Sequence, residues 1–134
     1  MTTSNQAGAD AISIAGRRCG AGHPPLLVAE LSGNHAGRLE RALAMVDAAA
    51  QAGADLIKIQ TYRADTITID NDAPAFRIES GLWQGRSLYE LYEQAHTPWE
   101  WHAALFERAH ELGVPMFSSP FDPTAVVLLE SLDC

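Results

Sequence analysis

Short apolar runs alternate with helical stretches along this chain, and this alternation limits the possible folds more than any other feature. Strands are predicted at residues 26–29, 56–60 and 114–119. Apolar residues at helical spacing separate them, most clearly from Leu39 to Ala50. Continuous apolar runs are typical of strands buried on both faces of a parallel sheet, and a βα-βα-βα order suits right-handed crossovers. The sequence therefore predicts an α/β fold, either an open doubly wound sheet or a barrel.

Local signals predict the remaining elements. Residues 11–18, which alternate at 12–14, are predicted to form a small strand before a glycine-rich turn at Gly20 and Gly22. Residues 63–81 form a long polar loop without a clear period. A helical stretch is predicted at residues 83–95. Thr97 is predicted to cap the next helix, which would start at Pro98 with Glu100 completing a capping box. A last helix should open at Asp122-Pro123, and residues 1–10 are expected to form a loose tail ahead of one domain over residues 11–134.

Composition excludes several classes of function. The 134 residues are 47% hydrophobic and 19% charged, which is typical of a globular chain. The net charge of −8 leaves no basic stripe, so nucleic acid is not an expected partner. No run is long enough to span a membrane and no signal peptide is visible, so we expect a cytoplasmic protein without a membrane partner. The cysteines Cys19 and Cys134 lie near opposite ends and are expected to be reduced.

Strand parity gives the sharpest indication of a site. The first predicted βα turn has neither G-x-G-x-x-G nor a P-loop pattern, which disfavours a nucleotide-binding open sheet. In the second strand, Ile57 and Ile59 share one face while Lys58 and Gln60 share the other. In a barrel the isoleucines suit the helix-covered outside, and the polar pair reaches the mouth at the strand C-termini, where barrel active sites lie. The alternative is an edge strand with Lys58 in solvent.

Two other strand ends can contribute to the same mouth. Glu30 ends the first strand with the parity of Leu26 and Val28, so it can share that mouth. There it could handle a proton or accept a hydrogen bond beside an anion held by Lys58. The simpler alternative is a structural ion pair between Glu30 and Lys58. Ser118 and Ser119 end the third strand, and one of their hydroxyls would face inward and could bond a phosphate oxygen.

The five histidines do not form a local metal site. His102 and His110 are eight residues apart on the helix predicted after Pro98, rather than at the i,i+4 spacing of a helical metal pair. The others lie in predicted loops. His35 follows a strand end and could line the mouth. We therefore predict no complete metal site within these residues.

At this point the motifs resemble the sialic acid synthase family in order and spacing. The family-wide motifs are AELSGNH at 29–35, AGAD at 52–55, KIQTY at 58–62 and FSSPFD at 117–122. Four further stretches are similar to its pseudaminic acid branch: ISIAGR at 12–17, LWQG at 82–85, SLYELY at 87–92 and TPWEWH at 97–102. The resemblance covers residues 11–134.

The resemblance implies a (β/α)8 TIM barrel, of which this chain would supply the first three βα units, followed by a small antifreeze-like domain. It implies condensation of phosphoenolpyruvate with an amino sugar, 2,4-diacetamido-2,4,6-trideoxy-altrose, to give pseudaminic acid and phosphate. Lys58 and Ser119 match phosphate-binding positions. Glu30 and Gln60 match catalytic positions near the reacting centre and the sugar, and Asn34 and His35 are expected to help bind substrate. A divalent metal of the manganese or magnesium type and a homodimer are also implied.

Some parts of the family pattern have no counterpart in this chain. An acceptor-binding Asn of the neuraminate branch has no secure match, and residues 83–86 occupy its region. The family's metal-binding histidines and second domain would follow Cys134, and a barrel needs roughly 250 residues. We therefore expect an N-terminal portion that is inactive alone. Two alternatives stay open: an N-acetylneuraminate synthase that uses N-acetylmannosamine, and a catalytically inactive truncated product.

Overall fold

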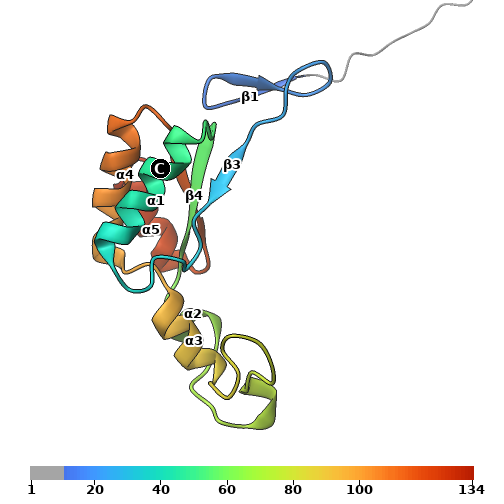
Figure 1. The fold of residues 1–134 in the computed structure, drawn as a ribbon, viewed down its shortest axis with the longest axis vertical. Helices are drawn as coiled ribbons and strands as arrows, with labels where there is room; N and C mark the ends of the chain where they lie inside the picture. The colour runs from blue at the N-terminus through green and yellow to red at the C-terminus, as the bar shows by residue number, and fades with distance from the viewer. Residues whose placement is uncertain (1–10) are drawn as a thin grey trace, which may run out of the picture.

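A three-stranded parallel sheet with helices along one side forms the centre of the molecule. The computed structural model describes residues 11–134, so the predicted tail, residues 1–10, lies outside the described residues. The sheet order is β3-β4-β5, and α1, α4 and α5 lie together on one side of it (Figure 1). The elements are β3 (Val28–Glu30), α1 (Leu39–Gln51), β4 (Leu56–Thr61), α4 (His102–Glu111), β5 (Met116–Pro120) and α5 (Pro123–Ser131). The predicted βα-βα-βα order is confirmed.

The core lies between the sheet and the helices. Ile57 and Ile59 are 0% and 1% exposed, and they belong to one cluster with Val46 of α1 and with Leu105 and Ala109 of α4. Their parity is the one the sequence predicts for the helix-covered face. A glycine in the left-handed region follows each of two helices, because Gly53 and Gly113 come after α1 and α4 with φ of 82° and 70°.

A hairpin precedes the sheet. β1 (Ile12–Ile14) pairs antiparallel with β2 (Arg17–Cys19), so the predicted small strand is confirmed. The predicted turn at Gly20 and Gly22 is also confirmed, since the His23 amide donates to the Gly20 carbonyl at 3.1 Å. A single strand over residues 11–18 was wrong, because the chain already turns at Ala15 and Gly16, both with positive φ. Arg17 forms an ion pair with Asp55 just before β4, which ties the hairpin to the end of the sheet where the strands begin (Figure 1).

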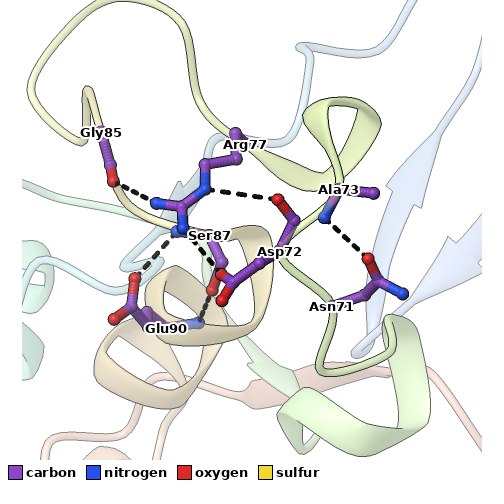
Figure 2. Close-up of polar contacts among 7 residues, drawn as sticks. All are labelled: Asn71, Asp72, Ala73, Arg77, Gly85, Ser87 and Glu90. Atoms are coloured by element: carbon purple, nitrogen blue, oxygen red, sulfur yellow. Dashed lines mark hydrogen bonds and ion pairs between the residues drawn. The ribbon is translucent and has the colours of Figure 1, made fainter.

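The segment between β4 and α4 extends past the other end of the sheet, where the strands finish (Figure 1). It contains α2 (Ala64–Ile67), η1 (Pro74–Phe76) and α3 (Leu88–Ala95). Figure 2 shows how the long polar loop is ordered: the Arg77 guanidinium donates to the Asp72 carboxylate at 2.9 Å and to the Gly85 carbonyl at 3.0 Å. Tyr62, at the base of the segment, is 5% exposed and packs edge-on against Tyr92 of α3.

Two predicted helix starts were wrong. α3 begins at Leu88 rather than at residue 83, because Ser87 forms a capping box with Glu90 (Figure 2). The box predicted at Thr97 does not form, since Pro98 has an extended ψ of 136° and caps a 3-10 turn, η2 (Trp99–Trp101). α4 therefore starts only at His102. The predicted start of α5 is confirmed, because the Asp122 carboxylate accepts from the amides of Thr124 and Ala125.

Candidate active site at the strand ends

Four polar side chains gather where the three strands end, on the sheet face opposite the helices. They are Glu30 of β3, Lys58 and Gln60 of β4, and Ser119 of β5, and we call them the strand-end cluster. The register pairs Glu30 with Lys58 and Gln60 with Ser119, and side chains directly opposite in register share a face. Within residues 11–134 no helix covers this face, so the cluster lies open on the side that a barrel would enclose.

An ion pair forms one half of the strand-end cluster. Lys58 Nζ lies 2.7 Å from Glu30 Oε2, and the two side chains are 29% and 33% exposed. An ammonium group carries three N–H donors, so Lys58 can hold Glu30 and still offer hydrogen bonds to a second anion. Lys58 can therefore form the ion pair with Glu30 and bind an anionic substrate at the same time.

Gln60 and Ser119 form the other half. Both side chains are partly exposed, and neither hydrogen-bonds another protein group within the part of the chain that the structure describes. An amide and a hydroxyl beside an ammonium group can donate to the oxygens of a phosphate or carboxylate. The arrangement suits a small anionic substrate, and the roles of the four residues stay predictions.

Asn34 and His35 do not join this cluster. Asn34 is exposed, donates from Nδ2 to the Leu31 carbonyl at 3.2 Å, and lines a hollow of about 360 Å³ with Trp83 and Gln94. His35 is 3% exposed and packs edge-on against Trp101 at 5.2 Å, while its Nδ1 accepts from the Gly37 amide. Burial lowers the pKa of His35. Its ring therefore lies in the helix layer, and a direct substrate contact for either residue stays a prediction.

A buried hydrogen-bonded chain, which no sequence motif predicted, lies on the helix side of the same strand ends. It runs from His102 at the start of α4 through Thr61 of β4 to Ser118 of β5. Strand parity could have indicated it, because Thr61 and Ser118 alternate with the outward Gln60 and Ser119. Nothing in the local sequence indicates that His102 reaches them, since it lies 41 residues from Thr61.

A larger hollow lies away from this site. It measures about 650 Å³ and lies beside Phe106 of α4, Val114 and Met116 at the beginning of β5, and Leu132 after α5. Most of the residues that line it are apolar, and no member of the strand-end cluster lines it. Chemistry at the strand ends does not involve this hollow.

The described residues offer no obvious place for a metal or a membrane span. Residues 11–134 contain no group of three or more His, Cys, Asp or Glu side chains arranged to hold a metal ion. The divalent metal implied by the resemblance thus does not fit a site built from these residues, and we assign them no step through a metal. None of the helices between residues 11 and 134 is long and apolar enough to cross a membrane.

Comparison with known proteins decides the family. Residues 45–134, about two thirds of the chain, match the NeuB family. The chain belongs to the NeuB family. Among NeuB-type relatives, the chain is 53% identical over 107 residues to the pseudaminic acid synthase of Campylobacter jejuni serotype O:2, covering 80% of this chain and 31% of that protein. The Helicobacter pylori pseudaminic acid synthase is 48% identical over 111 residues, covering 83% and 33%.

A solved NeuB-type structure supports the fold. The N-acetylneuraminic acid synthetase of Leptospira borgpetersenii, in complex with citrate, superposes with a TM-score of 0.74 at 26% identity, covering 92% of this chain and 38% of that one. The predicted TIM-barrel class is confirmed, with this chain supplying the first βα units. The chain spans about a third of the length of the curated relatives that it matches.

Proposed function

We propose that the protein carrying this chain is a pseudaminic acid synthase. It would condense phosphoenolpyruvate with 2,4-diacetamido-2,4,6-trideoxy-altrose and release phosphate. The observation that carries the proposal is the 53% and 48% identity to pseudaminic acid synthases, against 26% to the N-acetylneuraminic acid synthetase from Leptospira. The open strand-end cluster supports it, because an anionic donor needs local hydrogen-bond donors in a chain of net charge −8.

The chemistry follows from the two substrates. Carbon 3 of the enol attacks the aldehyde carbon of the open-chain sugar, and water adds at carbon 2. The tetrahedral intermediate then expels phosphate by breaking a carbon–oxygen bond. Lys58 and Ser119 would hold the phosphate, because an ammonium and a hydroxyl can donate to its oxygens. Glu30, 2.7 Å from Lys58, can accept a proton near the reacting carbons, and Gln60 can orient the sugar.

The second candidate is an N-acetylneuraminate synthase that uses N-acetylmannosamine. The structural likeness to the Leptospira enzyme favours it, since that protein carries this activity in its name. Both candidates use the same donor, so the strand-end cluster does not distinguish them. The difference must lie in residues that contact the sugar.

An assay of the full-length protein with each acceptor tests the proposal. We expect phosphate release from phosphoenolpyruvate with the diacetamido altrose and a kcat/KM at least about tenfold higher than with N-acetylmannosamine, a difference of 1.4 kcal/mol. Preference for the mannosamine would move the protein to the second candidate. Release of phosphate with neither sugar would overturn both. Sedimentation of the same protein would test the homodimer that we propose by analogy with the family.

A further inference from the structure

A buried histidine is linked to the strand ends through two hydroxyl groups. His102 is 0% exposed, and its Nε2 lies 2.8 Å from Thr61 Oγ1. Thr61 is also 0% exposed, and its Oγ1 lies 2.6 Å from Ser118 Oγ. The other ring nitrogen, Nδ1, lies 3.1 Å from the Pro98 carbonyl. Both nitrogens of a fully buried imidazole thus have partners, and the chain joins α4 to β4 and β5.

The direction of each hydrogen bond follows from the partners. A carbonyl oxygen only accepts, so His102 Nδ1 carries the hydrogen and donates to Pro98. Nε2 of a neutral ring then accepts from the Thr61 hydroxyl, and Thr61 Oγ1 accepts from Ser118. Burial lowers the pKa of His102, which agrees with a neutral ring. One tautomer therefore satisfies both ring nitrogens, while the single Ser118 hydrogen is shared between Thr61 Oγ1 and the Ile59 carbonyl, which lies 3.2 Å from Ser118 Oγ.

The network links the two strands where β4 and β5 end. The backbone ladder continues past Pro120, since the Phe121 amide donates to the Thr61 carbonyl at 3.1 Å. The hydroxyl pair of Thr61 and Ser118 supplies a side-chain connection across β4 and β5 at this level. Their immediate neighbours, Gln60 and Ser119, point to the opposite face and belong to the strand-end cluster.

We propose that His102 is a positioning residue which, through Thr61 and Ser118, holds the ends of β4 and β5 so that Gln60 and Ser119 face the bound substrate at a fixed separation. The identity of that substrate rests on the proposed function, whereas the positioning of Gln60 does not. A core-filling role alone does not account for the residue, because an aliphatic side chain would fill the volume without burying two polar nitrogens.

Matched variants in the full-length protein separate positioning from packing. His102→Gln keeps a hydrogen-bonding group near Nε2 and should retain the Thr61 contact. His102→Asn keeps a group near Nδ1 and should lose it. Thr61→Val and Ser118→Ala break the network without touching the histidine, and Ser118→Ala is the mildest change should the others fail to fold. Ser131→Ala, which removes an exposed hydroxyl outside the network, is the control.

Two readouts are needed. The first is the side-chain amide resonance of Gln60 in protein labelled with ¹⁵N-glutamine, which needs no substrate. We expect it to shift in His102→Asn, Thr61→Val and Ser118→Ala, and to stay near the parent position in His102→Gln and Ser131→Ala. The second is steady-state kinetics. His102→Asn, Thr61→Val and Ser118→Ala should each raise the KM for phosphoenolpyruvate or lower kcat by roughly tenfold to a hundredfold.

The outcomes distinguish the two claims. An unmoved Gln60 resonance in folded Ser118→Ala and His102→Asn overturns the positioning role, whatever the enzyme does. Equal effects of His102→Gln and His102→Asn also overturn it, because they indicate loss of packing rather than loss of the Thr61 contact. A shifted Gln60 in a protein that never consumes phosphoenolpyruvate upholds the positioning role and refutes the proposed function.

Discussion

Lys58 is the only lysine in the chain, and its environment suggests binding rather than stability. Its ion pair with Glu30 is about one third exposed on each side. Pairs with this exposure contribute little to folding, since water and salt screen them. The carboxylate of Glu30 instead holds the Lys58 ammonium group in place at the strand end, 2.7 Å away. There the ammonium group can also donate a hydrogen bond to an anionic substrate.

Replacing Lys58 should therefore affect substrate binding more than folding. We expect Lys58→Ala in the full-length protein to weaken phosphoenolpyruvate binding by about 2–4 kcal/mol, because a desolvated phosphate loses its charge partner. Titration calorimetry and the KM for phosphoenolpyruvate measure this loss. Arg18→Ala removes an equal charge from the exposed hairpin and should change neither value. An unchanged KM in Lys58→Ala would refute the assignment of Lys58.

At the scale of single elements, the helices begin where a side chain can satisfy their first amides. Ser87 is 3% exposed, its hydroxyl accepts from the Glu90 amide at 3.1 Å, and its own amide donates to the Glu90 carboxylate at 2.8 Å (Figure 2). Arg77 orders the loop that leads into this cap. The capping box at the start of α3 therefore helps to order the segment between β4 and α4.

Removing the Ser87 hydroxyl should loosen α3 locally. We expect Ser87→Ala to cost about 1 kcal/mol, which corresponds to roughly fivefold faster amide exchange at Glu90 and its neighbours in the first turn. Hydrogen exchange followed by mass spectrometry measures it. Ser80→Ala, in the exposed loop, serves as the control and should leave the exchange of α3 unchanged. Similar exchange in both variants would show that the cap does not stabilise α3.

The start of α4 should make stability depend on pH. Burial lowers the pKa of His102, with Glu100 acting to raise it and His96 acting to lower it further. Below about pH 6.5 the unfolded chain binds a proton that the folded chain binds less readily. The contribution of His102 is therefore complete above that pH and is lost as the pH falls through the folded pKa.

The measurement is the free energy of unfolding between pH 7.5 and pH 5. We expect it to fall with decreasing pH by at most about 1.4 kcal/mol per pH unit for each buried histidine. His102→Gln should remove one such contribution, while His35, whose pKa is lowered in the same direction, keeps the other. His110→Gln, on the exposed side of α4, is the control. A pH profile that His102→Gln leaves unchanged would contradict the prediction.

At the scale of the whole molecule, the two faces of the sheet differ. Helices cover one face of the sheet, and the other face presents the strand-end cluster without helices over it in residues 11–134 (Figure 1). β3 and β5 each pair on one side only within this range. A barrel active site draws residues from several strand ends, and three strands cannot enclose a substrate.

We therefore expect residues 1–134, expressed alone, to release no phosphate from phosphoenolpyruvate with the diacetamido altrose. The physical reason is that one wall of donors neither excludes water nor surrounds the reacting carbons. A continuous phosphate assay, with the full-length protein as positive control, measures the difference. Sustained turnover by the 134-residue chain would show that the strand-end cluster is sufficient for catalysis.

The order of the elements and the two faces of the strands follow from spacing along the chain. Leu39–Ala50 as a helix, Asp122 as a cap, and the opposite faces of Ile57 and Lys58 all follow from spacing along one segment. These features depend on the geometry of neighbouring residues, with periods of 3.6 in a helix and 2 in a strand. Parity therefore anticipated that Glu30, Lys58, Gln60 and one of the two serines that end β5 would share a face, and the register shows that this serine is Ser119.

The contacts between distant segments, in contrast, depend on how the folded chain packs. Ser87 rather than Thr97 caps a helix, since Pro98 is extended where the Thr97 box would form. His35 is buried against Trp101 rather than at the mouth. His102 reaches Thr61 across 41 residues, and Thr61 reaches Ser118 across 57. Such pairs depend on how helices pack on the sheet and on which buried polar groups can satisfy one another, and no local pattern contains that information.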